Sequence, residues 1–136
     1  MRTSIATVCL SGTLEEKMRA AASAGFDGIE VFEPDLVVSP SSPEQLRELA
    51  AELGLSLDMY QPFRDGVEVA PEAFPDSLRR LRAKCELMNR LGTTVLLVCS
   101  NVATGVLDDD QAIAEQLRAA GDVADEYGID LAYEAL

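Results

Sequence analysis

The sequence predicts an α/β fold with the element order (βα)4β. The main observation is one pattern that occurs four times: a helix-like segment, a glycine, and a short apolar run with a polar residue at its far end. The four glycines are Gly25, Gly54, Gly92 and Gly128. A glycine just past a helix is a common left-handed cap, and a short apolar run after it is typical of a buried parallel strand. Strict alternation of this kind favours a parallel sheet with right-handed crossovers.

The helix starts carry local signals. Thr13 followed three residues later by Glu16 forms a capping box, and Ser42 with Pro43 is a typical N-cap and first helical position. The expected elements are strands at 3–10, 29–33, 55–61, 94–99 and from 129 onward, helices at 14–24, from 43, at 76–91 and from the acidic run at 108–110, and loops at 34–42, 62–75 and 100–107. This order fits two architectures, an open flavodoxin-like sheet and the first part of a (β/α)8 barrel. Periodicity does not choose between them.

Composition limits the function classes. The 136 residues suffice for one domain with a moderate core, and 48% of them are hydrophobic. The net charge of −13 repels phosphate backbones and anionic lipid, so we expect no nucleic-acid and no membrane partner. No apolar run approaches the ~20 residues that cross a bilayer, and the first twelve residues are more consistent with a strand than with a signal peptide. We therefore expect a cytoplasmic protein.

Several common sites are excluded by residue type. The chain has no histidine, so it cannot build a histidine-based triad or a histidine-rich zinc site by itself. The first βα turn, CLSGTLEE, lacks the glycine patterns that hold phosphates. Cys9, Cys85 and Cys99 are widely spaced in apolar surroundings, which favours three small buried hydrophobic residues over a metal or redox pair.

Polar residues gather where the predicted strands end, which is where parallel α/β folds keep their active sites. Glu134 is the most informative, because a carboxylate inside an apolar strand is costly unless it is paired or bound to a metal. The Arg64 guanidinium suits a substrate carboxylate or phosphate, which its planar fork can bind bidentately. Each also has a plain structural interpretation, as solvated acids, a surface ion pair or a turn residue. The full set is Glu33, Gln61, Arg64, Ser100, Asn101 and Glu134.

Four segments carry a family resemblance: the first 36 residues, then QPFRD, VCSN and YEAL. Together they resemble the start of the bacterial 3-dehydroshikimate dehydratases, a group of the sugar phosphate isomerase/epimerase superfamily whose fold is similar to xylose isomerase. The resemblance covers the whole chain. It implies a TIM (β/α)8 barrel of about 250 residues or more, of which residues 1–136 would be the amino-terminal (βα)4β half.

The resemblance also implies a chemistry: loss of water from 3-dehydroshikimate to give protocatechuate, with one divalent metal (Mg, Mn or Co). The first metal ligand would be Glu134, and Arg64 would contact the small-molecule substrate with Gln61 and Ser100 as weaker candidates. The other ligands and the catalytic histidines would lie in later strands. One departure is Pro34, where the family pattern has Asn.

Two alternatives stay open: an epimerase or isomerase of the same superfamily, and a non-catalytic open-sheet binding domain. Half a barrel would leave two strand edges and one side of its core uncovered. Such surfaces promote association, so we expect a homo-oligomer.

Overall fold

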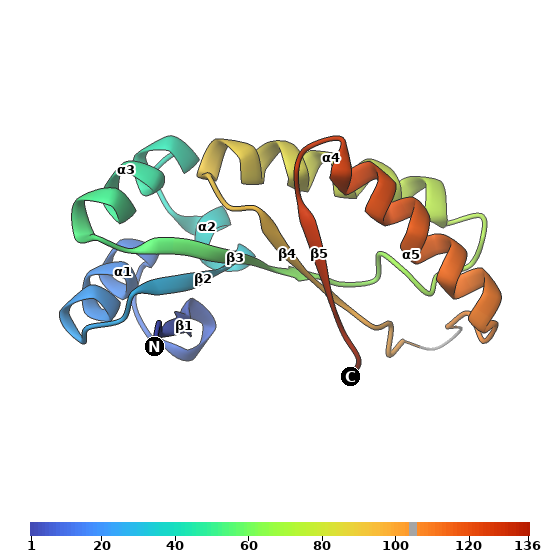
Figure 1. The fold of residues 1–136 in the computed structure, drawn as a ribbon, viewed down its shortest axis with the longest axis horizontal. Coiled ribbons are helices and arrows are strands. Elements are labelled where there is room, and N and C mark those ends of the chain that lie inside the picture. The colour runs from blue at the N-terminus through green and yellow to red at the C-terminus, as the bar shows by residue number, and fades with distance from the viewer. Residues whose placement is uncertain (104–105) are drawn as a thin grey trace. The chain divides into compact units, whose positions relative to one another are not determined.

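The computed structural model describes residues 1–103 and 106–136 and contains one five-stranded sheet (Figure 1). The strands follow one another in chain order, and the pairs β1–β2, β2–β3 and β4–β5 are parallel. A flavodoxin-like sheet has the order 2-1-3-4-5, so the sequential order favours the barrel over the open sheet. The strands are β1 (Ser4–Ala6), β2 (Gly28–Phe32), β3 (Ser56–Phe63), β4 (Val95–Cys99) and β5 (Asp130–Glu134).

The described residues form five α-helices between these strands, two of which (α2 and α3) lie between β2 and β3: α1 (Leu14–Ser23), α2 (Glu33–Val38), α3 (Pro43–Leu53), α4 (Phe74–Leu91) and α5 (Asp110–Asp125). The predicted caps are confirmed. Capping boxes begin α1 and α3, and all four repeat glycines have a positive φ, between 69° and 87°. Of the acidic run, Asp109 is the N-cap of α5, where its Oδ1 accepts hydrogen bonds from the amides of Gln111 and Ala112.

Two predicted elements are wrong. The first strand stops at Ala6 and becomes a 3-10 helix, Thr7–Cys9, because the buried Thr7 Oγ1 accepts a hydrogen bond from the Phe32 amide at 2.9 Å. The expected loop at 34–42 begins as α2, with Pro34 in its first turn, where proline is favoured. Of the expected loop at 100–107, Thr104 and Gly105 lie outside the described residues.

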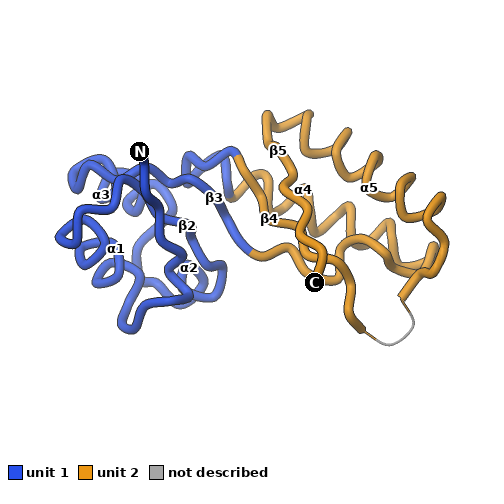
Figure 2. Tube along the Cα trace, turned by 60° about the horizontal axis from the view of Figure 1, so that its bottom comes forward, with its two compact units in different colours: residues 1–61, 88–94 blue, residues 62–87, 95–136 orange. Residues whose placement is uncertain are grey.

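The chain divides into two compact units (Figure 2): residues 1–61 with 88–94, and residues 62–87 with 95–136. The first unit buries side chains of β2, β3 and the helices before them, including Ile29, Val31, Leu46 and Tyr60. The second buries Leu81 and Cys85 from α4, Leu96 and Val98 from β4, and Ala124 from α5. Among the described residues, no helix is long and apolar enough to cross a membrane.

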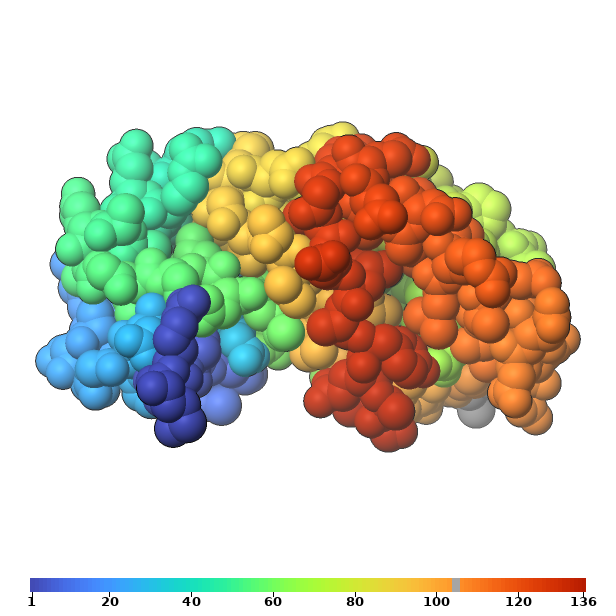
Figure 3. Space-filling model, in the orientation of Figure 1, coloured from blue at the N-terminus to red at the C-terminus, as the bar shows by residue number. Residues whose placement is uncertain are grey.

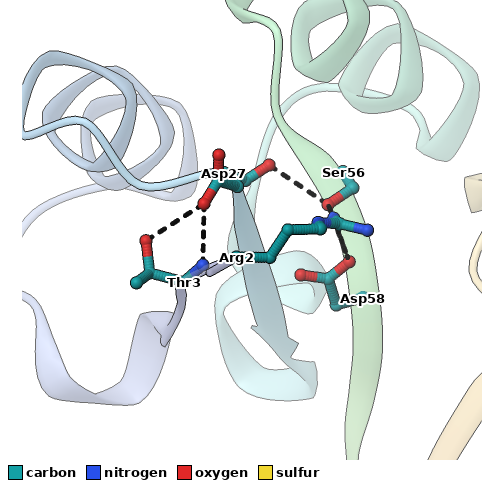
Figure 4. Close-up of polar contacts among 5 residues, drawn as sticks. All are labelled: Arg2, Thr3, Asp27, Ser56 and Asp58. Atoms are coloured by element: carbon teal, nitrogen blue, oxygen red, sulfur yellow. Dashed lines mark hydrogen bonds and ion pairs between the residues drawn. The ribbon is translucent and has the colours of Figure 1, made fainter.

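A polar network joins the amino ends of β1, β2 and β3 (Figure 4). The Asp27 carboxylate accepts hydrogen bonds from the amide and hydroxyl of Thr3 at 2.7 and 3.2 Å. Asp58 Oδ1 accepts from the Ser56 hydroxyl at 2.7 Å and forms an ion pair with Arg2 at 3.2 Å. A Cβ at Gly28 would lie 2.0 Å from Asp58 Oδ2, so this approach requires glycine. These contacts fix the strands at the end opposite the carboxyl ends.

Candidate functional site

The second unit brings Glu134 beside the end of β4. Glu134 pairs in register with Cys99, so the two side chains lie on the same face of the sheet. Cys99 Sγ lies 3.9 Å from Glu134 Oε2. Burial raises the pKa of the Cys99 thiol, the positive charge of Arg64 opposes this rise, and the negative charge of Glu134 adds to it. The charges of Arg64 and Glu134 therefore both act on the Cys99 thiol.

Arg64 follows directly after β3, and its side chain is exposed. Its guanidinium makes no hydrogen bond or ion pair with any residue that the structure describes. Its backbone is fixed, since the Arg64 carbonyl accepts a hydrogen bond from Arg80 at 3.0 Å. The Arg64 guanidinium therefore has both of its parallel N–H donors available, and it can bind the carboxylate of an external molecule bidentately.

Ser100 forms hydrogen bonds with the end of β5, which the sequence did not predict. Its amide donates to the Glu134 carbonyl at 2.9 Å, and its hydroxyl oxygen accepts from the Leu136 amide at 2.8 Å. The side chain therefore fastens the end of β5. A substrate contact for Ser100 stays a prediction.

Gln61 lies in the first unit, where its amide donates to Glu30 Oε2 at 2.8 Å. Glu33 accepts a hydrogen bond from the Tyr60 hydroxyl at 3.2 Å. Tyr60 is fully buried, and burial together with the charge of Glu33 raises the pKa of its phenol. A solvated acid was the plain structural interpretation of Glu33 in the sequence. The structure pairs Glu30 with Gln61 and holds Glu33 against Tyr60 instead.

Sequence reasoning missed Glu68, in the loop after β3. Glu68 is 7% exposed and has a φ of +58°. One carboxylate oxygen accepts a hydrogen bond from the Tyr133 hydroxyl, and the other accepts from the Asn101 amide at 3.0 Å. Asn101 also starts a turn, with its Oδ1 accepting from Ala103, as its structural interpretation predicted. The length of the 62–75 loop was the only sequence signal.

Glu134 is more exposed than predicted. It is the last residue of β5, and both it and Tyr133 are solvent-exposed; the red carboxyl-terminal segment lies on the visible surface in Figure 3. The expected burial of this carboxylate is therefore absent in this chain. Its oxygens have the chemistry that Mg²⁺ and similar hard ions prefer. Within the described ranges, no group of three or more His, Cys, Asp or Glu side chains could hold a metal ion, so Glu134 fits one ligand of a metal and not a complete site.

Comparison with known proteins gives the relatives of this chain. A family model described as "Xylose isomerase-like TIM barrel" matches residues 18–136. The 3-dehydroshikimate dehydratases of Pseudomonas putida and Pseudomonas aeruginosa are 46% and 47% identical over all 136 residues. The chain spans about a fifth of the length of these curated relatives, 21% and 22%.

Solved structures agree on the fold. A xylose isomerase-like TIM barrel/4-hydroxyphenylpyruvate dioxygenase fusion protein matches the whole chain with a TM-score of 0.97 at 46% identity, over 22% of its own length. The IOLI protein with a bound zinc atom matches with a TM-score of 0.84 at 16% identity, over 52% of its length. Both alignments cover 100% of this chain, so every element described above, β1 to β5, takes part in the likeness.

Proposed function

Because this chain belongs to the xylose isomerase-like TIM barrel family, we propose that it forms the amino-terminal part of the barrel of a metal-dependent 3-dehydroshikimate dehydratase. The proposal is supported mainly by the 46–47% identity to two curated 3-dehydroshikimate dehydratases, which extends over all 136 residues of this chain. The reaction removes water from 3-dehydroshikimate and leaves protocatechuate. It needs no oxidant, since the proton and the hydroxide that leave the ring combine as one molecule of water.

In this proposal Arg64 binds and orients the substrate carboxylate. Its guanidinium is exposed and makes no hydrogen bond or ion pair with a described residue, so the bidentate fork stays available. Gln61 and Ser100 are weaker substrate contacts, because each already has a partner within the chain. A neutral sugar would bind the Arg64 guanidinium less strongly than a carboxylate does, because it carries no negative charge. The epimerase alternative is therefore second.

Glu134 is proposed as the metal ligand of this chain. A bound divalent ion would act as a Lewis acid that stabilises negative charge developing on the ketone oxygen when the neighbouring proton leaves. The described residues offer Glu134 but no complete ligand group, and the chain contains no histidine. We therefore propose that the remaining ligands and the proton acceptor lie outside these 136 residues, and that this chain alone is inactive.

The test uses the full-length protein and follows protocatechuate by its ultraviolet absorbance. Glu134→Gln keeps the shape but removes the charge, so metal affinity and turnover should both fall by two orders of magnitude or more. Asp130→Asn is the matched control, because Asp130 is also an exposed acid on β5 but at the opposite end of the strand. Turnover should stay within twofold for that variant.

Two outcomes would contradict the proposal. Normal turnover after Glu134→Gln would remove the metal assignment, and turnover by the 136-residue chain alone would show that the site is drawn in the wrong place. Arg64→Lys should raise KM with a smaller effect on kcat, because an ammonium cannot reproduce the fork. An unchanged KM would remove Arg64 from the substrate site.

A further inference from the structure

The loop that carries Arg64 has an unusual backbone. Asp65 and Glu68 have φ values of +52° and +58°, a left-handed backbone conformation that residues other than glycine rarely adopt. Between them, a Cβ at Gly66 would lie 2.2 Å from Cε1 of Phe63. Phe63 is itself 1% exposed. The loop is therefore tightly packed and held in a conformation that its own residues do not prefer, so contacts from outside must support it.

Arg80 on α4 supplies such a contact. Its Nη2 donates to the Arg64 carbonyl at 3.0 Å, and its Nη1 donates to the Asp65 carbonyl at 3.1 Å. The guanidinium carbon also lies 5.3 Å from the centroid of the Phe63 ring, within cation–π distance. One planar group thus contacts three successive residues, the last residue of β3 and the first two of the loop. A lysine could not do this, because its ammonium is a single point with no fixed fork.

We propose that Arg80 is a positioning residue that sets the direction of the Arg64 guanidinium and so determines affinity for the substrate carboxylate. The inference rests on the proposed function, because it assumes that Arg64 binds substrate. Arg80 acts through the backbone carbonyls of residues 64 and 65 and through the ring of Phe63. A misplaced guanidinium weakens substrate and transition state alike, which raises KM and leaves kcat unchanged.

The experiment compares variants of the full-length protein in steady-state assays of protocatechuate formation. Arg80→Ala and Arg80→Lys should each raise KM about tenfold, with kcat within twofold. Lysine keeps the positive charge but cannot bind both carbonyls. A raised KM in Arg80→Lys would therefore show that the hydrogen bonds to the Arg64 and Asp65 carbonyls matter, and not the charge alone. The matched control is Arg79→Ala. Arg79 is the adjacent exposed arginine, and its one ion pair among the described residues is with Asp76 on its own helix, so the KM of this variant should not change.

A double-mutant cycle completes the test. In the Arg64→Ala background, Arg80→Ala should add nothing to KM, because the guanidinium that it positions is gone. An equal effect in both backgrounds, or rescue by Arg80→Lys, would overturn the inference. If Arg64→Ala raises KM while both Arg80 variants leave it unchanged, the inference fails and the proposed function stands. If Arg64→Ala itself leaves KM unchanged, the proposed substrate contact fails instead.

The folding control is circular dichroism and urea unfolding of each variant. Arg80→Lys keeps the length and charge of the side chain, so it serves as the deciding variant if Arg80→Ala does not fold. If Arg80→Lys raises KM while its urea unfolding midpoint is unchanged, the result supports a positioning role for Arg80. A KM equal to that of the unmodified protein contradicts it.

Discussion

The buried ion pair between α1 and α2 should contribute far more to stability than a surface pair does. Lys17 Nζ lies 2.8 Å from both carboxylate oxygens of Asp35, and the two side chains are 7% and 15% exposed. Replacing Lys17 by Met keeps the length of the side chain and removes its charge. The Asp35 carboxylate would then remain largely buried without the cation that faces it.

The magnitude follows from the geometry. At 2.8 Å and an effective dielectric constant of about 20, the attraction is about 6 kcal/mol before the cost of desolvation is subtracted. Removing one partner of a buried pair typically costs about 3–5 kcal/mol. Asp35 retains some contact with water, so we expect the lower end, about 3 kcal/mol, for Lys17→Met. The exposed pair Arg79–Asp76, with side chains 73% and 68% exposed, should contribute about 0.5 kcal/mol or less.

The assay is urea unfolding followed by circular dichroism, with Arg79→Ala as the surface-pair control. Lys17→Met/Asp35→Leu should recover most of the loss, because replacing both charges by apolar groups of similar volume is often close to neutral. A loss below about 1 kcal/mol for Lys17→Met, or a double variant no more stable than the single one, would refute the reasoning.

Three further predictions concern the second unit, the thiols and the assembly. Glu68→Ala and Glu68→Gly both remove the carboxylate that accepts hydrogen bonds from Tyr133 and Asn101. Glycine adopts the φ of +58° freely, so in urea unfolding the alanine variant should be about 1 kcal/mol less stable than the glycine variant. Equal stability of the two variants would show that the backbone is not strained at this residue. A thiol reagent at neutral pH should label the exposed Cys9 first, because Cys85 and Cys99 are 0% and 1% exposed and burial raises the pKa of Cys85 to about 11; mass spectrometry of each cysteine checks the order, and early labelling of Cys85 would contradict it. The isolated 136-residue chain should self-associate through its uncovered β5 edge, and sedimentation as a single monomer at tens of micromolar would count against this.

Local backbone chemistry made much of the fold predictable. The four glycine caps and the two helix starts at Thr13 and Ser42 depend on residues within one turn of each other, and the structure has them where the sequence predicts. Because strands of a parallel sheet end at a common edge, the polar residues at their carboxyl ends were also recognisable as a set. The resemblance, not the periodicity, favoured the barrel, and the sequential strand order supports that choice.

Contacts between residues distant in the chain decided the rest. The pairs Lys17–Asp35, Arg80–Arg64 and Glu68–Tyr133 are 18, 16 and 65 residues apart, and no local pattern encodes them. They connect α1 with α2, hold the backbone of the loop at Arg64, and engage the buried carboxylate of Glu68. The sequence alone determined where most of the strands and helices begin and which polar side chains follow the strand ends. Only tertiary packing decided which of those side chains are already bound and which, like Arg64, remain available.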